Sequence, residues 1–407
     1  MSNNEWPFSP PETQKWIEKI TKELKESAHK INYVNDLEQL SFPITDRPEF
    51  RLSSQIKKPN NDWHNTAPIF VLDEVSANKQ ALNCLNQGAD ALFFVIQIDS
   101  VNWEQLFAII GLSYIQTRIY FENRTALESL LNHSLFVKEN NLHPEVDAIV
   151  HSEKQDDLNY ILNGFEWQQC GASMSDEIAA CLALGNELLS KGIPCENIVF
   201  HLGVNPHYFE EIAKFTVCRF AWDNLCDAYN QSNNSKFVAR LGWTNKSLKD
   251  PYTNLLRQTT EAMSAICGGI DYLVVHPYDQ QTLESSDEFS SRMALNISNL
   301  LKDESYLDKV QFPLEGSFVI TNLSKVLFEK AWEKFLELEE LNREPKLQKI
   351  KSWVSESAEK RKEAFEKGQT SLIGINIFPN PQAIEPKTFV AKNYLGMPYL
   401  HFESLNQ

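Results

Sequence analysis

The spacing of hydrophobic residues in the second half of the chain predicts two successive strand–loop–helix units. A short apolar run at 236–242 is typical of a buried strand. After a loop, apolar residues recur at helical spacing from Leu255 to Ile266, and Gly268-Gly269 is expected to end this helix. A strand at 270–275 and a helix from Phe289 to Leu301 repeat the order. This alternation is typical of a parallel α/β fold.

Runs of β-branched and aromatic residues predict eight strands along the chain, at 91–97, 117–122, 147–151, 159–165, 197–203, 236–242, 270–275 and 371–377. Most of these are continuous β-branched and aromatic runs, as expected for strands that are buried on both faces. Helical segments such as 77–87 and 175–191 lie between them. We therefore predict a (β/α)8 TIM-type barrel over residues 61–385, which exceeds the typical length of about 250 residues through insertions.

Three stretches depart from the barrel pattern. Residues 1–60 are predicted to form a helical and extended arm, with one apolar helix face made of Trp16, Ile17, Ile20 and Leu24. This face packs either on the chain's own barrel or on a partner subunit. A charged helical insertion at about 324–367 is expected to bury an inner face made of Trp332, Phe335, Leu336 and Leu338. Residues 386–407 form a tail.

The charge of the chain excludes several classes of partner. The formal net charge is -17, from 38 Lys and Arg against 55 Asp and Glu. Nucleic acids and anionic membrane surfaces attract clusters of cations, so neither is expected as a partner. There is no apolar run of membrane-spanning length, and the first residues lack the basic and apolar parts of an export signal. We expect a cytoplasmic protein.

The sequence offers no familiar catalytic or metal-binding motif. It lacks GxGxxG, the P-loop, GxSxG and HExxH, and the spacing of His201 and His207 fits no regular pair of metal ligands. Seven cysteines lie at irregular spacing without a CxxC pair, so we expect reduced thiols in the core and no metal site. They are Cys84, Cys170, Cys181, Cys195, Cys218, Cys226 and Cys267.

Six motifs, in a common order, resemble the barrel of the cobalamin-dependent methylmalonyl-CoA mutases. They are GFEWQQCGAS (164–173), GVNPHYFEEIAKFTVCRFAW (203–222), RLGWTNKSLKDPYTNLLRQTTEAMSAICGGIDYL (240–273), SSRMALNISNLL (290–301), PLEGSFVI (313–320) and RKEAFEKGQTSLIGIN (361–376). The resemblance covers roughly residues 60 to 380, and several ordered motifs are far more specific than one glycine signature.

The resemblance implies a cobalamin-binding domain after the barrel in single-chain active members, where an Asp-x-His-x-x-Gly motif supplies a histidine to the cobalt. Thirty residues follow Ile377, so we expect no C-terminal cobalamin-binding domain and no cofactor bound by this chain. The nearest string, 62–67, precedes the barrel and has Ala67 where close passage of the backbone requires glycine. We interpret Asp62 and His64 as surface loop residues.

The resemblance also places Phe165 and Glu166 where active members have tyrosine and histidine. In those members the tyrosine lies against the substrate and the corrin, and the histidine hydrogen-bonds the thioester carbonyl. Phe165 has no hydroxyl group. An ionised Glu166 would offer a carbonyl only acceptor lone pairs, and burial would have to keep it protonated for it to donate. A surface or salt-bridged glutamate at a strand end is the simpler interpretation.

A further histidine of active members corresponds to Val274 or, with a slip of one residue, to Val275. His276 is adjacent, but alternation along a strand would place its side chain elsewhere, and we interpret it as a polar loop residue. The stretch at 77–106 contains one glycine, whereas catalytic subunits have a glycine-rich segment there. In this respect it looks like the small subunit of the heterodimeric mutases.

We therefore expect a non-catalytic small (beta) subunit of a heterodimeric methylmalonyl-CoA mutase. Its partner would be the catalytic large subunit, which binds adenosylcobalamin and interconverts methylmalonyl-CoA and succinyl-CoA. One alternative is the barrel subunit of a split acyl-CoA mutase that acts with a separate cobalamin-binding protein. Another is a barrel that binds acyl-CoA as a regulatory ligand. A cluster of Arg or Lys at the barrel mouth would hold the phosphates, and the sequence offers Lys236, Arg240 and Lys246 without fixing their positions.

Overall fold

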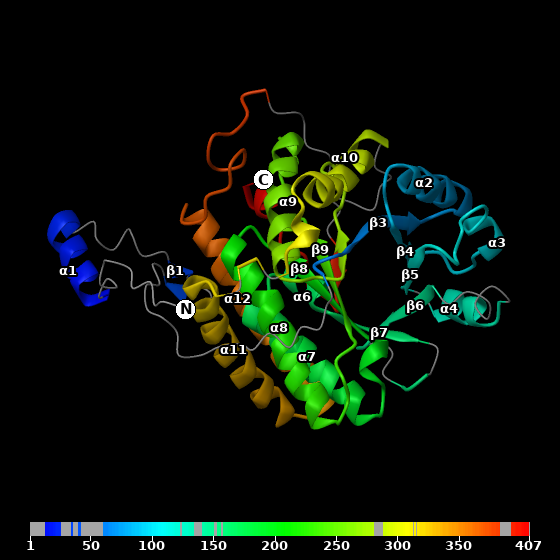
Figure 1. The fold of residues 1–407 in the computed structure, drawn as a ribbon, viewed down its shortest axis with the longest axis horizontal. Helices are drawn as coiled ribbons and strands as arrows, with labels where there is room; N and C mark the ends of the chain where they lie inside the picture. Colours follow the sequence, from blue (N-terminus) through cyan, green and yellow to red (C-terminus); the bar gives the residue numbers. More distant parts are fainter. Residues whose placement is uncertain are drawn as a thin grey trace, which may run out of the picture.

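Eight of the described strands close into a parallel barrel in the order β10-β3-β4-β5-β6-β7-β8-β9 (Figure 1). The computed structural model describes residues 13–25, 34–35, 40–41, 60–122, 124–133, 141–149, 153–155, 158–280, 288–311, 313–314, 316–382 and 392–406. The barrel strands are β3 (His64–Val71), β4 (Ala91–Ile96), β5 (Gln116–Phe121), β6 (Leu142–Asp147), β7 (Asn159–Asn163), β8 (Ile198–Val204), β9 (Lys236–Leu241) and β10 (Tyr272–Val274). The predicted (β/α)8 barrel is confirmed.

The strand predictions differ from the structure in three ways: one strand was missed, one predicted strand is not formed, and one lies earlier in the chain. The barrel begins with β3, which was not among the predicted strands, and β3 closes the ring by pairing with β10. The run at 371–377 forms only an isolated bridge between Ile373 and Ile377. The strand expected at 147–151 lies earlier, as β6.

Because β3 was missed, His64 was assigned to a loop. His64 is the first residue of this strand rather than a loop residue, and its ring stacks on Tyr272 at a centroid distance of 4.8 Å. Asp62 does lie in the loop before the strand, where it pairs with Lys302 at 2.7 Å.

Helices surround the barrel in the expected alternation. Those that follow barrel strands are α2 (Glu74–Asn86), α3 (Trp103–Leu106), α4 (Arg124–Leu131), α6 (Gly164–Gln169), α7 (Met174–Ser190), α8 (Tyr208–Ala228), α9 (Pro251–Cys267) and α10 (Glu288–Asn299). α9 ends at Cys267, before Gly268, as predicted, but it begins earlier than the apolar spacing indicated, at Pro251. Gly269 follows with φ of +82°, a conformation that glycine adopts without strain.

Two long helices form a second layer over part of the helical ring. α11 (Phe318–Glu339) packs on α7 and α8, and α12 (Arg343–Glu366) packs on α7. Because α7 is covered by the barrel on one side and by these helices on the other, nearly all of its residues are buried. Phe335 and Leu338 of the predicted inner face are buried, whereas Leu336 is half exposed and faces outward.

The other described elements include the helix α1 (Thr13–Leu24), the β1–β2 pair (Val34–Asn35 and Leu40–Ser41), and the hairpin of β11 (Asn393–Tyr394) with β12 (Met397–Pro398). Short helical turns lie at Leu300–Glu304, Leu307–Lys309 and Phe402–Asn406. The side chains of Trp16 and Ile17 lie outside the described residues. The division of the chain into arm, barrel and tail, and the role of the arm, therefore stay predictions.

The barrel strands are buried on both faces, as their continuous apolar runs predicted. On β4, the outward Leu92, Phe94 and Ile96 pack into the large core beneath the helices. The inward Ala91 joins a separate apolar cluster inside the barrel, which also contains Val199, Val238, Tyr272 and Val274. This cluster fills part of the interior, so the barrel is a packed core rather than a pore.

Gly171, between α6 and α7, offers a test of how firmly α12 is held. A Cβ at Gly171 would lie 2.5 Å from the Cβ of Ala358 in α12, and the glycine has φ of +104°. Gly192 also has a positive φ, of +76°, but no atom within 4 Å of its Cβ position. Gly192→Ala should cost about 1–2 kcal/mol of stability through backbone strain alone. Gly171→Ala should cost a further 1–3 kcal/mol or so from overpacking.

Chemical denaturation of the two variants and the unsubstituted chain measures this difference. Equal losses for Gly171→Ala and Gly192→Ala would mean that α12 moves aside freely.

Candidate functional site

In a barrel of parallel strands, functional groups gather at the carboxyl ends of the strands. Here Phe165 and Glu166 occupy that end, because α6 begins directly after β7. The guanidinium of Arg240, from β9, lies 3.8 Å above the centroid of the Phe165 ring. The same guanidinium is 3.8 Å from Glu166, which also accepts a hydrogen bond from the hydroxyl of Tyr399. Glu166 therefore has two partners within its own chain.

The three positions at the end of β10 have different environments. Val274 points inward with the apolar cluster, whereas Val275 belongs to the core outside the barrel. His276 continues the inward alternation of Tyr272 and Val274 and is 1% exposed. His276 does lie past the end of β10, as expected, but its side chain is buried because the chain keeps its extended alternation there.

His276 lies in an aromatic enclosure at the barrel mouth. Its ring centroid is 4.6 Å from Trp243, 6.1 Å from Phe70 and 6.4 Å from Phe165. Neither ring nitrogen has a hydrogen-bond partner among the described residues. Burial lowers the pKa of His276 well below its usual value, and the positive charges of Arg240 and Lys392 add to this effect. The imidazole is therefore neutral at physiological pH.

The C-terminal segment 392–406, called here the C-terminal cap, covers the barrel mouth. The Tyr399 hydroxyl donates to Glu166, and the Tyr394 hydroxyl donates to Asp147, at the end of β6, at 2.8 Å. The Lys392 ammonium lies 5.8 Å from the rings of both Phe70 and Trp243. The cap thus contacts groups at the ends of β3, β6, β7 and β9.

Hydrogen bonds fix the end of the cap to the loops around the mouth. The backbone N–H of Leu400 donates to the carbonyl of Gln169 at 2.8 Å, and that of Phe402 to the carbonyl of Thr244 at 3.0 Å. The buried Glu403 carboxylate accepts from the Ser247 hydroxyl at 2.9 Å and from the N–H of Leu248. In Figure 1 this segment, in red, lies beside α9. The cap is an integral part of the fold.

Below the mouth, the interior holds a buried charge network. Arg118 of β5 pairs with Glu145 of β6, and Nε2 of His201 from β8 is 3.4 Å from the same carboxylate. All three side chains are almost completely inaccessible to solvent. The Arg118 guanidinium lies 4.6 Å above the Tyr272 ring, next to the apolar cluster. Desolvation lowers the pKa of His201 to about 4 and outweighs the attraction of Glu145.

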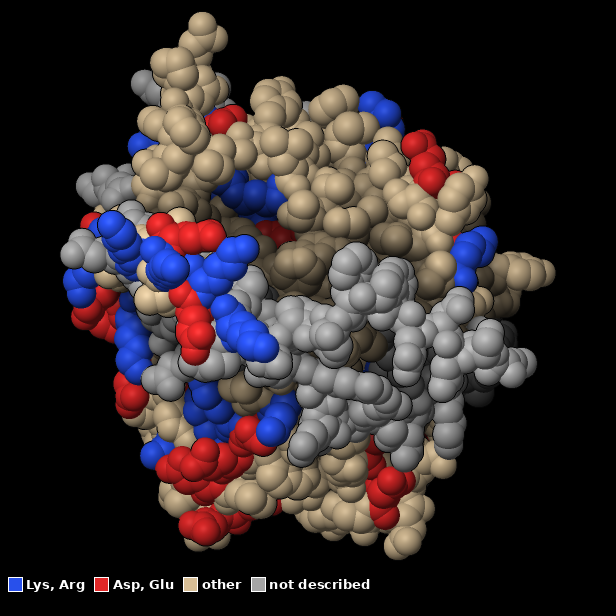
Figure 2. Space-filling model, turned by 60° about the vertical axis from the view of Figure 1, so that its left-hand side comes forward, with Lys and Arg blue, Asp and Glu red and all other residues tan. Residues whose placement is uncertain are grey.

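The cations proposed to hold the phosphates of an acyl-CoA do not form a cluster. Lys236 begins β9, so it lies at the opposite end of the barrel from the mouth. Arg240 is engaged with Phe165 and Glu166, and the Lys246 ammonium is 2.7 Å from Glu261. Figure 2 likewise shows Lys and Arg interleaved with Asp and Glu on one face, with both signs in the hollow at its upper centre.

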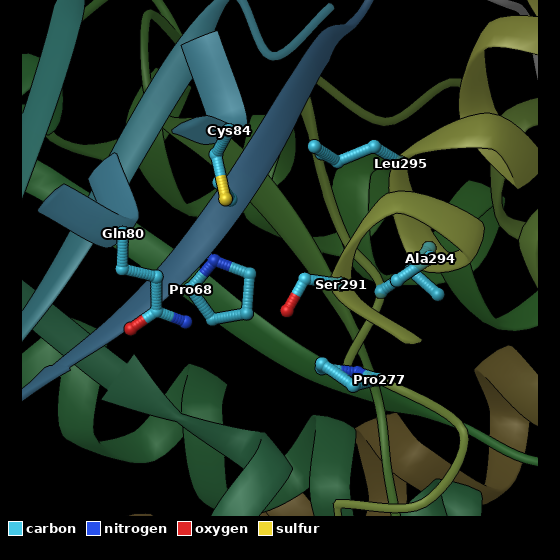
Figure 3. A pocket seen from close by; sticks show the side chains of 9 residues that line it. Pro68, Gln80, Cys84, Pro277, Ser291, Ala294 and Leu295 are labelled. Carbon is cyan, nitrogen blue, oxygen red and sulfur yellow. The ribbon is translucent and has the colours of Figure 1, made fainter. Parts of the chain in front are cut away.

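A small cavity lies beside the barrel, between β3, α2 and α10 (Figure 3). Its volume is about 10 Å³, and Pro68, Gln80 and Ser291 are among its lining residues. Such a space holds about one water molecule, so it cannot admit an acyl group.

All seven cysteines are buried and free, as predicted. Within the described ranges, no three His, Cys, Asp or Glu side chains gather closely enough to hold a metal ion. No helix in the part of the chain that the structure describes is both long and apolar enough to cross a membrane.

Sequence reasoning found Phe165 and Glu166 but missed the residues that surround them. Tyr394 and Tyr399 lie in the tail, where nothing in the local pattern indicates a contact with the barrel. For His276, the signal was available, because it follows Tyr272 and Val274 at strand spacing. Polar side chains also interrupt the strands β5, β6 and β8, at Arg118, Glu145 and His201. Charged groups that are buried at such positions are expected to pair with one another.

The buried histidines predict a loss of stability in acid. Burial lowers the pKa of His201 and His401 to about 4, and that of His276 well below its usual value, so the unfolded chain takes up their protons first as the pH falls. Their contribution should be complete above about pH 6.5 and decline toward pH 4, by up to about 1.4 kcal/mol per pH unit for each histidine. His276→Phe, which keeps an aromatic ring in the enclosure, should show a shallower decline.

Denaturant unfolding of both proteins between pH 7 and pH 4.5 measures the two slopes. The same slope with and without His276 would contradict the assignment of a neutral buried imidazole.

The sequence is similar to known methylmalonyl-CoA mutases. A family model described as methylmalonyl-CoA mutase matches residues 147–394. The methylmalonyl-CoA mutase small subunit of Porphyromonas gingivalis is 29% identical over 439 aligned residues, which cover 92% of this chain and 70% of that protein. The methylmalonyl-CoA mutase of Rhizobium meliloti is 29% identical over 241 residues, which cover 55% of this chain but only 34% of that protein.

Similarity to solved structures is weak. A dihydropteroate synthase of Xanthomonas albilineans aligns with 59% of this chain and 92% of its own, at 10% identity and a TM-score of 0.33, too low to support a conclusion. The family model, in contrast, spans more than half of the chain, from the end of β6 to β11. The chain therefore belongs to the methylmalonyl-CoA mutase family.

Proposed function

We propose that this chain is the non-catalytic small (beta) subunit of a heterodimeric, adenosylcobalamin-dependent methylmalonyl-CoA mutase. The catalytic large subunit would bind the cofactor and interconvert methylmalonyl-CoA and succinyl-CoA in the cytoplasm. This chain would stabilise the large subunit by burying a shared interface. The similarity to a protein named as a mutase small subunit supports this assignment.

The covered barrel mouth is the observation that carries the proposal. A substrate acting at this end would have to reach Phe165 and Glu166, and Tyr399 lies against Glu166. The ring of Tyr399 also stacks on Trp243, with 6.4 Å between centroids. Displacing the cap would leave Glu166 and Asp147 without their tyrosine donors, and buried groups that lose a partner are destabilised by about 1–3 kcal/mol each. The chain fills the mouth with its own side chains.

The same residues do not fit a corrin ring. A flat macrocycle facing the mouth would need the space that the C-terminal cap occupies, where Lys392 lies over Phe70 and Trp243. Phe165 is covered by Arg240, so its ring face is already in contact. We therefore assign adenosylcobalamin to the partner subunit and derive no catalytic step in this barrel.

The arm at residues 1–60 is our candidate for part of the contact with the large subunit. A permanent heterodimer of this size buries an interface of about 2,000 Å² or more. A helix whose apolar residues share one face needs a surface to cover that face, and a partner subunit would supply it.

A mixing experiment tests the assignment. This chain alone, the large subunit alone and the mixture are assayed for mutase turnover with adenosylcobalamin, while light scattering follows the size of the complex. We expect no turnover by this chain, and a stable one-to-one complex that is active. Turnover by this chain with only a free cobalamin-binding protein would instead identify it as the barrel subunit of a split mutase.

Variants at the mouth separate a structural role from a catalytic one. In the active complex, Glu166→Gln should leave kcat and KM within about twofold, because no substrate reaches this side chain. Loss of a group that polarises a carbonyl typically lowers kcat by about 10²–10³-fold. A loss of that size would overturn the proposal, provided that Tyr399→Phe, which removes the same hydrogen bond from the cap side, leaves activity unchanged.

A further inference from the structure

Two of the buried thiols lie against each other at the end of the barrel opposite to the mouth. Cys195 belongs to the 3-10 helix Cys195–Asn197, directly before β8, and Cys226 to the last turns of α8. Their sulfur atoms are 2.6 Å apart. The two residues thus join the start of a barrel strand to the far end of the helix that follows it.

The backbones that carry these thiols are tied to one connecting loop. The N–H of Cys195 donates to the side-chain carbonyl of Gln231 at 2.8 Å, and the N–H of Gln231 donates to the carbonyl of Cys226 at 2.9 Å. The Ser235 hydroxyl donates to the carbonyl of Cys195 at 2.6 Å. These bonds hold the main chains at Cys195 and Cys226 in place next to one loop, so the two residues stay neighbours in the folded chain.

The two cysteines are buried close to the protein surface. Both cysteines are buried, but the residues that follow them, Glu196 and Asp227, are exposed. A small local opening of the 3-10 helix at Cys195 or of the last turn of α8 would therefore expose the sulfurs to solvent. Access to Cys181 or Cys218, in contrast, requires separation of packed helices.

The two thiols differ in reactivity. The two sulfurs share a hydrogen bond in which either thiol can be the donor. When Cys226 donates, the bond stabilises the thiolate of Cys195 and lowers the pKa of Cys195. The same bond, together with burial, raises the pKa of Cys226. Since the thiolate is the attacking species in thiol–disulfide exchange, Cys195 is the nucleophile of the pair.

We propose that Cys195 and Cys226 are a redox modification site that forms a reversible intramolecular disulfide with a small disulfide oxidant such as glutathione disulfide. The Cys195 thiolate attacks one sulfur of the oxidant and expels a glutathione thiolate, which gives a mixed disulfide. Cys226, after loss of its proton to solvent, attacks the Cys195 sulfur and expels the second glutathione. Two protein thiols are oxidised, and one glutathione disulfide is reduced to two glutathiones.

The disulfide would cross-link the end of α8 to the residues directly before β8. The linked residues are 31 positions apart, so the cross-link restricts the unfolded chain over a loop that contains a whole strand–helix unit. The native frame already holds the sulfurs together, so the oxidised protein should melt several degrees higher than the reduced one. The site would thus stabilise the subunit under oxidising conditions.

The test uses the full chain, incubated with glutathione disulfide and then denatured for thiol titration and intact-mass measurement. We expect the loss of two thiols and of two hydrogens in mass, a Cys195–Cys226 peptide after digestion, a raised Tm, and reversal of all four by dithiothreitol. Cys226→Ser should stop the reaction at the mixed disulfide, with the loss of one thiol, the addition of one glutathione in mass and no cross-linked peptide. Cys84→Ser, beside the small cavity, should leave the loss of two thiols and the shift in Tm unchanged.

Several results would overturn the proposal. They are retention of all seven thiols, a stable glutathione adduct as the end product, a cross-link between two chains, or an oxidised peptide that joins any other pair. The peptide map of the unsubstituted chain decides these outcomes even if a serine variant fails to fold.

Discussion

The closed barrel imposes one constraint on which the rest of the structure depends: a charge inside it must find its partner inside it. Water does not reach Arg118, Glu145 or His201, so their mutual pairing replaces hydration. Removing one member of such a pair typically costs about 3–5 kcal/mol, because the other charge stays buried. The interior is therefore a connected polar core enclosed by apolar side chains, and it leaves little freedom to admit a ligand.

At the barrel mouth, too, charged groups are paired with partners from the same chain. Glu166 and Asp147 would be exposed carboxylates in an open barrel, and here tyrosine hydroxyls from the C-terminal cap satisfy them. Arg240 connects the two levels, since it contacts Phe165 at the mouth and lies 5.4 Å from the ring of Phe93 in the interior. Charge pairing within the chain thus occupies the region where members of the family with activity carry their chemistry, which is the physical basis of the structural role we propose.

Much of the fold was predictable because buried parallel strands have a local signature. β4 is apolar on both faces, and β9 is apolar on its outer face, at Phe237, Ala239 and Leu241, and the pattern alone located both strands. β3 was missed because it begins with polar residues and contains Pro68. The run at 371–377 was mistaken for a strand because Leu372 is apolar for another reason: it packs with Phe365 and Phe402 outside the barrel. The candidate site was predictable only as two positions, since its partners lie far away in the sequence.

The C-terminal cap also orders the events of folding. The hydroxyl of Tyr399 and the carboxylate of Glu166 are 233 residues apart along the chain, which makes this one of the longest-range contacts of the mouth. During synthesis the chain emerges from its N-terminus, and contacts at such separation form only after the intervening segments exist. The nascent barrel therefore has an open mouth until residues 392–406 leave the ribosome. During that interval, its acidic mouth is accessible to chaperones and to assembling partners.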